Sequence, residues 1–356
     1  MAMPYSIISA GGMHSLAKCK DGSVWSWGSN EFGQLGNGSG PFRELPKQVT
    51  LPPALSVSAG GAHSLALRKD GFISAWGGNA SGQLGDGTTT DRSSPTNVIK
   101  LRRASGIAAG TLHSLALYKD VVFAWGENFS GELGIGGFSG PRRTPMLIED
   151  FAYMQFVAAG LSHSLAVRDP GGRALGWGWN ALGKLGDGTE EMRDRPTLAL
   201  VGMSVSAVSA GIFHSLALGS NGKVMSWGGN TFGQLGDNTP VARRVPAFVS
   251  ELVGIKAISA GGYHSLALDG DGRVWSWGLN DDGQLGNGNS TSQSKPARIK
   301  GLSKVVAIAA GYHHSLAVLS SGKLASWGAN NLGQLGDETL TNRAIPGPVH
   351  GIDSVG

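Results

Sequence analysis

The chain has 356 residues, a net charge of +4 and 58 glycines, and only 15% of its residues are charged. Glycine is far above its usual ~7%, which indicates many tight turns, and the lack of a Gly-X-Y period excludes collagen. One cysteine, Cys19, excludes an intramolecular disulfide. No apolar run approaches the roughly 18 residues of a membrane span, and the first residues lack a secretory-signal pattern, so we expect a soluble, cytoplasmic protein.

An internal repeat organises the whole sequence. The tetrapeptide His-Ser-Leu-Ala occurs seven times, and each copy is followed by Trp-Gly, then Gly-x-Leu-Gly, then a proline. The repeated histidines are His14, His63, His113, His163, His214, His264 and His314, and the tryptophans are Trp27, Trp76, Trp125, Trp177, Trp227, Trp277 and Trp327. We therefore predict one domain over residues 1–356, built from seven repeats of about 50 residues.

Each repeat reads, in chain order, as four short strands. The first ends in a small-residue segment such as 308–311, and the second is His-Ser-Leu-Ala-Leu. A turn such as 69–71, with its Asp-Gly pair, leads to a third strand ending at the tryptophan. A long loop then leads to a fourth strand, which we expect to start at the proline because proline suits the first residue of an edge strand.

Residue alternation in the third strand predicts burial on both faces. The residue before each tryptophan is always small, and with a period of two it lies on the opposite face. Strands buried on both faces, four per unit and seven units in a row, predict an all-β, seven-bladed β-propeller with four antiparallel strands per blade, closed as a ring. The ends support closure, because Tyr5 and Val355 lie seven periods of 50 apart. The sequence leaves open which blade phase closes the ring.

The repeat motif also resembles that of a known family. Ala-Gly-x-x-His-Ser-Leu-Ala, Trp-Gly-x-Asn-x-x-Gly-Gln-Leu-Gly and the following proline are similar to the regulator-of-chromosome-condensation repeat, over essentially the whole chain. The resemblance implies a seven-bladed propeller. Its members include an exchange factor for a Ran-type GTPase that also docks on chromatin, a plant ultraviolet photoreceptor and a bacterial inhibitor of β-lactamases. The fold alone therefore does not give the function.

The His-Ser pairs have two interpretations. A serine beside a histidine can be a nucleophile with its base, but seven equivalent copies single out no active site. We expect instead that each histidine and serine hydrogen-bonds backbone where the blades meet the axis. Zinc prefers four convergent ligands, so we expect no metal, no cofactor and no catalytic residue.

A ring of basic residues precedes the blade prolines. It consists of Arg43, Arg92, Arg142, Arg193, Arg243, Gln293 and Arg343, and six residues before each lie Asn37, Asp86, Gly136, Asp187, Asp237, Asn287 and Asp337. The ring could bind phosphate. The repeat without arginine also lacks aspartate, which favours an ion pair or hydrogen bond inside each loop.

Apolar side chains at variable loop positions predict a partner site. Two loops of each blade project from the same end, one before the repeated histidine and one after Trp-Gly. Repeat two has only small residues at these positions, whereas repeats four and five are richest in large apolar residues. We predict a partner-binding face formed by Leu161, Trp179, Leu182, Ile212, Phe213, Phe232, Tyr263 and Tyr312. The alternative is that these side chains pack on one another over the channel mouth.

The function expected from these features is that of a non-catalytic scaffold that binds a protein partner through one propeller face. A second copy of the chain could be that partner. The alternatives are a nucleotide-exchange factor for a small GTPase, which we do not favour because the chain lacks the long loops and basic tail of the family's founder, and an inhibitor of a bacterial enzyme. The loop before each repeated histidine contains no tryptophan, unlike the photoreceptors. With a net charge of only +4, nucleic acid and chromatin are not expected.

Overall fold

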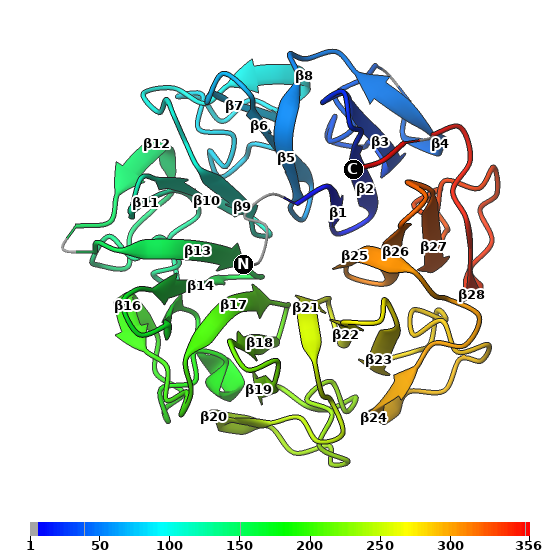
Figure 1. The fold of residues 1–356 in the computed structure, drawn as a ribbon. Helices are drawn as coiled ribbons and strands as arrows, with labels where there is room; N and C mark the ends of the chain where they lie inside the picture. The colour runs from blue at the N-terminus through cyan, green and yellow to red at the C-terminus, as the bar shows by residue number, and fades with distance from the viewer. Residues whose placement is uncertain (1–5, 39, 150, 353) are drawn as a thin grey trace.

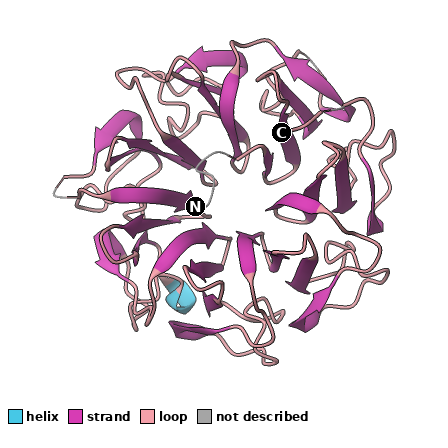
Figure 2. Ribbon diagram, viewed as in Figure 1, coloured by secondary structure: helices cyan, strands magenta, loops and turns pink. Residues whose placement is uncertain are grey.

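The computed structural model describes residues 6–38, 40–149, 151–352 and 354–356. Over these residues the chain forms seven four-stranded antiparallel sheets, arranged as blades around one axis (Figure 1). The helical content of the described residues is a single 3-10 turn, η1 (Ala181–Gly183) (Figure 2). The all-β, seven-bladed architecture predicted from the repeat is therefore confirmed.

All four strands of a blade follow one another in sequence, from the axis outward. The strands of blades 1 to 4 are β1 (Ile8–Ala10), β2 (His14–Lys18), β3 (Val24–Ser29), β4 (Phe42–Val49), β5 (Ala54–Ala59), β6 (His63–Arg68), β7 (Ile73–Gly77), β8 (Arg92–Asn97), β9 (Gly106–Ala109), β10 (His113–Tyr118), β11 (Val121–Gly126), β12 (Arg142–Leu147), β13 (Met154–Ala159), β14 (His163–Arg168), β15 (Arg173–Gly178) and β16 (Arg193–Leu198). Those of blades 5 to 7 are β17 (Val205–Ala210), β18 (His214–Gly219), β19 (Val224–Gly228), β20 (Arg243–Phe248), β21 (Ile255–Ala260), β22 (His264–Asp269), β23 (Val274–Gly278), β24 (Gln293–Arg298), β25 (Val305–Ala310), β26 (His314–Leu319), β27 (Leu324–Gly328) and β28 (Arg343–Pro348).

The seven repeated tryptophans form the core between blades, as expected. All seven are fully buried. Trp227 packs with Leu165 and Val167 of the preceding blade, and its Nε1 donates a hydrogen bond to the Lys184 carbonyl there, at 2.7 Å. Because the only polar atom of the indole has a hydrogen-bond partner, the tryptophan packs between neighbouring blades without leaving a buried polar group unsatisfied.

The fourth strand does not start at the proline. In blade 2 the outer strand β8 begins at Arg92, three residues before Pro95. The pairing of β7 with β8 shifts register between Ala75 and Gly77, so Pro95 lies inside an irregular stretch of the strand. A proline is tolerated there because a bulge on an edge strand needs no amide donor. The prediction was therefore wrong by three residues.

The C-terminal residues close the ring. Val355 forms a β-bridge with Cys19, at the position that Val305 takes opposite Leu319 in blade 7. Ile352 and Val355 are buried in one cluster with Ile8 and Trp27. The way in which the ring closes is thus established. All four strands of blade 1 come from the N-terminal repeat, and Val355 takes the place of the residue that begins the innermost strand in other blades. Tyr5, the sequence equivalent of Val355, lies outside the described residues.

No helix long and apolar enough to cross a membrane occurs in the described part of the chain.

Candidate functional site

Seven His-Ser hydrogen bonds run around the ring. Each histidine Nε2 meets the serine Oγ of the next blade, for example His14 with Ser64 at 2.9 Å. The ring closes where His314 meets Ser15, also at 2.9 Å. The five other pairs are His63–Ser114, His113–Ser164, His163–Ser215, His214–Ser265 and His264–Ser315. The expectation that serine bonds backbone is confirmed, whereas the expectation for histidine was wrong, since its partner is the neighbouring serine.

The direction of these hydrogen bonds argues against a nucleophile-base pair. Ser64 Oγ donates its proton to the Gln34 carbonyl at 2.8 Å, so it accepts from His14 Nε2–H. A histidine that donates to the serine cannot take the serine proton. Complete burial lowers the pKa of His14 to about 3, so the imidazole is neutral. The His-Ser ring is therefore a structural seam between blades.

A second closed ring surrounds the axis just inside the loops that precede the histidines. The amide of Gly61 donates to the Gly110 carbonyl at 3.1 Å, and equivalent bonds join every pair of neighbouring blades. Glycine is required at positions such as Gly110, because a Cβ would lie 2.4 Å from the His113 ring and 2.7 Å from the Gly160 carbonyl oxygen. These glycines hold the blades close enough to narrow the channel to a cavity of about 60 Å³.

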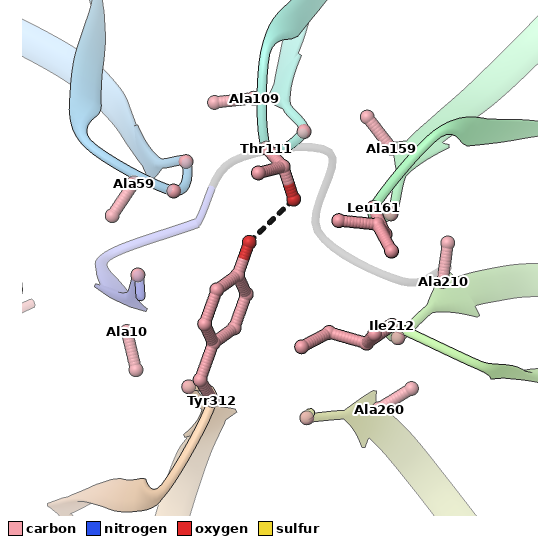
Figure 3. Close-up of a pocket in the computed structure, with 18 of the residues that line it drawn as sticks. Ala10, Ala59, Ala109, Thr111, Ala159, Leu161, Ala210, Ile212, Ala260 and Tyr312 are labelled. Atoms are coloured by element: carbon pink, nitrogen blue, oxygen red, sulfur yellow. Dashed lines mark hydrogen bonds between the residues drawn. The ribbon is translucent and has the colours of Figure 1, made fainter. Parts of the chain in front are cut away.

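Four side chains larger than alanine line the mouth of this cavity (Figure 3). They are Thr111, Leu161, Ile212 and Tyr312, which come from blades 3, 4, 5 and 7. The Tyr312 hydroxyl and the Thr111 hydroxyl share a short hydrogen bond across the axis. Burial raises the pKa of the Tyr312 phenol, so the group stays protonated. Leu161, Ile212 and Tyr312 were predicted partner residues, and the structure places all three around the channel mouth.

The other aromatic residues of the predicted partner site form a continuous row of rings beside this mouth. Ring centroids of Trp179 and Phe213 lie 6.0 Å apart, and those of Phe213 and Tyr263 lie 5.3 Å apart. Phe232 meets Tyr263 edge-on at 5.3 Å. All four rings are only partly buried, and the neighbouring Leu182 is exposed. We call Trp179, Leu182, Phe213, Phe232 and Tyr263 the aromatic face.

A buried lysine underlies the aromatic face. Lys184 Nζ lies 3.7 Å from the centre of the Trp179 ring and donates to the Ile212 carbonyl at 3.0 Å. Its side chain is fully buried, and burial lowers its pKa to about 7. In five blades a glutamine occupies this position, and the Gln234 oxygen, for example, accepts the Phe232 amide. Lysine cannot accept such a bond, and its loop forms η1 with Leu182 at a φ of 63°.

The sequence interpretation missed Lys184 and its counterpart in blade 3, Glu132. Glu132 is also fully buried, and burial raises its pKa to about 7. Its Oε2 accepts the Ser130 amide at 2.8 Å, as the glutamines do. The signal was present in the repeat, since only these two copies depart from Gln-Leu-Gly. Two ionisable groups at a repeated glutamine position mark blades 3 and 4 as different from the others.

The ring of basic residues before the blade prolines is engaged in contacts within its own loops. Arg92 pairs with Asp86 at 2.7 Å and Arg193 with Asp187 at 2.8 Å, and Asp237–Arg243 and Asp337–Arg343 repeat the pairing. In blade 6 the uncharged equivalents Asn287 and Gln293 hydrogen-bond at 3.2 Å. The intra-loop interpretation is therefore confirmed for these copies, and the carboxylates satisfy the arginines that a phosphate would need.

The geometry defines a class of molecule: a rigid seven-bladed ring whose repeated polar residues are structural and which carries an aromatic face beside the channel mouth. A family model, the RCC1-like domain, matches residues 3–201 and 154–356. The chain belongs to the RCC1-like family.

Solved structures agree with this assignment. The chain is similar to human WBSCR16, with 26% identity and a TM-score of 0.83, covering 92% of this chain and 94% of the other. It is similar to yeast RCC1 (Prp20) bound to Kap60, with 25% identity and a TM-score of 0.82, covering 98% and 85%. Prp20p of Saccharomyces cerevisiae, described with its binding to Gsp1p and histones, matches at 24% identity and a TM-score of 0.80, covering 98% and 88%, and shows the fold alone. No curated protein sequence matches the chain.

Proposed function

We propose that this propeller is a non-catalytic interaction module that binds a protein partner through the aromatic face. The observation that carries the proposal is the continuous row Trp179–Phe213–Tyr263–Phe232, with ring centroids 5.3 to 6.0 Å apart and every ring partly open to solvent. Aromatic rings packed side by side on a rigid frame are typical of binding hot spots. The row is absent from the equivalent positions of blade 2, which carry Gly78 and Ala62.

The packing alternative accounts for only part of the predicted residues. Leu161, Ile212 and Tyr312 face the channel mouth and contribute mainly to its closure. The aromatic face lies beside them on four loops of blades 4, 5 and 6. The two loops of blade 5 are tied together, since the Gly229 amide donates to the Phe213 carbonyl at 2.7 Å. Such pre-ordered loops lose little entropy when a partner docks.

The test compares capture of proteins from the source cell by four forms of the chain: the wild type, two variants of the aromatic face and one control. The double variant Trp179→Ala/Phe213→Ala and the surface variant Leu182→Glu should lose the same partner that the wild type retains. The matched control is Tyr153→Ala/Phe248→Ala, which removes two exposed aromatics that lie outside the aromatic face. Retention by both test variants, with melting temperatures close to wild type, would place the partner elsewhere.

Nucleotide exchange on a small GTPase is the second candidate. Prp20p, a structure similar to this chain, was described with its binding to Gsp1p, so the family resemblance does not support setting a GTPase aside. Accelerated release of a fluorescent guanine nucleotide from a small GTPase of the source cell, lost in Trp179→Ala/Phe213→Ala, would favour exchange. A second copy of the chain as partner would instead appear as concentration-dependent association in sedimentation velocity.

A further inference from the structure

On the opposite end of blade 2, basic residues gather where two loops meet. The hairpin between β6 and β7 carries Arg68 and Lys69, and the loop from β8 to β9 carries Lys100, Arg102 and Arg103 (Figure 1). The only carboxylate in these two segments is Asp70, which is already paired with Arg68. Five cations against one carboxylate give +4, which is as large as the net charge of the whole chain. We call these five cations the blade-2 basic cluster.

Contacts hold the cluster together around one aromatic ring. The Arg68 and Arg102 guanidinium carbons lie 5.2 and 5.1 Å from the centre of the Phe72 ring. The Arg103 backbone abuts the hairpin, because a Cβ on Gly71 would lie 2.9 Å from the Arg103 Cα. The Ala104 amide donates to the Gly71 carbonyl at 3.2 Å. The two loops are therefore one surface, with guanidinium groups resting on an aromatic ring.

The loop backbone does not dictate the cations. Lys100 and Arg103 have φ values of 60° and 59°, in the left-handed region that favours glycine. Sister loops keep this backbone shape with various residues: Gly301, Gly351 and Glu251 correspond to Lys100, and Gly254, Tyr153, Lys304 and Ser354 correspond to Arg103. The turn therefore accepts several residue types at both places, and blade 2 has a long basic side chain at each.

The cluster is also free to bind an anion. Lys69, Lys100, Arg102 and Arg103 are exposed, and within the described chain no carboxylate lies in ion-pair range of Lys100, Arg102 or Arg103. In the equivalent loops of blade 5, Glu251 and Val253 stand in place of Lys100 and Arg102. The charge is therefore a property of blade 2 and not of the repeat.

We propose that the blade-2 basic cluster binds single-stranded nucleic acid. Guanidinium forks match phosphate oxygens, and a guanidinium plane supported by an aromatic ring offers a stacking surface for an unpaired base. A membrane surface fits less well, because none of the exposed large apolar residues lies in these two segments. The modest overall charge hid this site in the sequence analysis, since acidic residues elsewhere balance the total. The inference does not depend on the aromatic face.

The test measures fluorescence anisotropy of labelled 15-nucleotide poly(U) and poly(dT) at 50 and 200 mM NaCl. Four phosphate contacts predict a log-log salt slope near −3, so the affinity should fall roughly 50-fold between the two salt concentrations. The triple variant Lys100→Gly/Arg102→Ser/Arg103→Gly takes each replacement from a sister loop. It should bind at least tenfold more weakly, with a slope flatter by about 2, and should melt no lower than wild type.

The matched control is Lys300→Gln/Lys304→Gly, which removes two cations from the same face in blade 6, one of them at a φ of 58°. It should change the affinity less than twofold. Three results would overturn the proposal: no oligonucleotide binding at 50 mM NaCl, equal loss in the control, or a lower melting temperature of the triple variant. Competition by polyglutamate or a 15-base-pair duplex as strong as that by the unlabelled oligonucleotide would also overturn it, in favour of an acidic protein segment or duplex DNA.

Discussion

A buried histidine recurs in every blade with the same hydrogen-bond partner. Each imidazole donates from Nε2 to a serine of the next blade, and in His14 and the other six the Nδ1 atom is buried without a hydrogen-bond partner among the described residues. A second proton on Nδ1 would place a charge in an apolar seam. Burial therefore lowers the pKa of these histidines, to about 3 in His214 and about 4 in His113.

This seam predicts acid-sensitive folding. Unfolded histidine has a pKa near 6.5, so between that value and the folded pKa the unfolded chain binds protons that the folded chain does not. The contribution of the seven neutral histidines should be nearly full well above pH 6.5 and fall below it, by about 1.4 kcal/mol per histidine at pH 5.5, or roughly 10 kcal/mol for seven. Glu132, whose pKa is raised, opposes this with one group.

The measurement is urea unfolding at pH 7.5, 6.5 and 5.5. His214→Gln should lower the number of protons taken up on unfolding at pH 5.5 by about one. Equal stability at pH 7.5 and 5.5 would contradict the neutral-histidine seam.

Lys184 gives a second prediction at the residue scale. Its pKa of about 7 lies below the ordinary 10.5 because of burial, so the unfolded chain binds the extra proton and stability rises as the pH increases from 7 to 10.5. Lys184→Gln restores the residue found in five sister blades. It should stabilise the fold by roughly 1–3 kcal/mol at pH 7, with a gain that shrinks toward pH 10 in denaturant melts. A constant gain at both pH values would show that charge burial is not its cause.

At the scale of the element, the loop after Trp-Gly is a self-contained polar unit. In blade 4 the Asn180 oxygen accepts the Leu185 amide at 2.9 Å, and Asp187 accepts from Thr189 and Arg193. The Asp187 side chain is 4% exposed and that of Arg193 is 30% exposed. The aspartate therefore organises the loop, and the arginine completes it from the edge strand.

A loop transplant tests this account. Asp187→Asn/Arg193→Gln copies the uncharged pair of blade 6, in which the Asn287 amide donates to the Gln293 oxygen. The double variant should lose less than 1 kcal/mol, whereas Asp187→Ala alone should lose about 1–3 kcal/mol, because it leaves buried donors unsatisfied. Thermal melts of both variants compare them directly, and equal losses would mean that the uncharged pair does not replace the aspartate–arginine pair.

Element boundaries show where sequence reasoning failed. The third strand and its buried tryptophan followed from alternation and repetition, because both faces of that strand are constrained. The outer strand was placed three residues late, and four in blade 1, because a proline in a bulge and a proline at a strand start look alike in sequence. The histidine partner was also missed, since a bond between blades depends on a neighbour about 50 residues away.

The predicted site divided according to the position of each residue in the repeat. Leu161, Ile212 and Tyr312 precede the repeated histidine closely and turn toward the axis, where they line the channel mouth with Thr111. Trp179 and Phe232 follow Trp-Gly, and they contact Phe213 and Tyr263 beside the mouth. Sequence variation identified both groups, but the sequence did not show that the position two residues before the histidine lines the mouth, whereas the position directly before it contributes to the aromatic face.

At the scale of the whole molecule, ring closure depends on a few residues. The Gly356 amide donates to the Lys18 carbonyl, and the Lys20 amide to the Ser354 carbonyl. Ile352 and Val355 are buried against blade 1. These contacts replace the continuous backbone that joins every other pair of neighbouring blades.

Deletion of residues 352–356 should therefore open the seam between blades 7 and 1. Loss of two buried aliphatic side chains predicts a destabilisation of about 3–5 kcal/mol. Cys19, which is buried beneath Val355, should react faster with a thiol reagent in the deletion variant than in the full chain. Unchanged thiol reactivity and an unchanged melting temperature would show that residues 352–356 are not needed to close the ring.

The two ends of the ring carry different chemistry, one aromatic and one basic, on a frame whose repeated residues are structural. The central claim, that the aromatic face binds a protein partner, is tested most directly by capture of that partner. A partner held by wild type and by Tyr153→Ala/Phe248→Ala, but lost from both Trp179→Ala/Phe213→Ala and Leu182→Glu while all four forms stay folded, is the predicted result. Undiminished capture by both aromatic-face variants would contradict it.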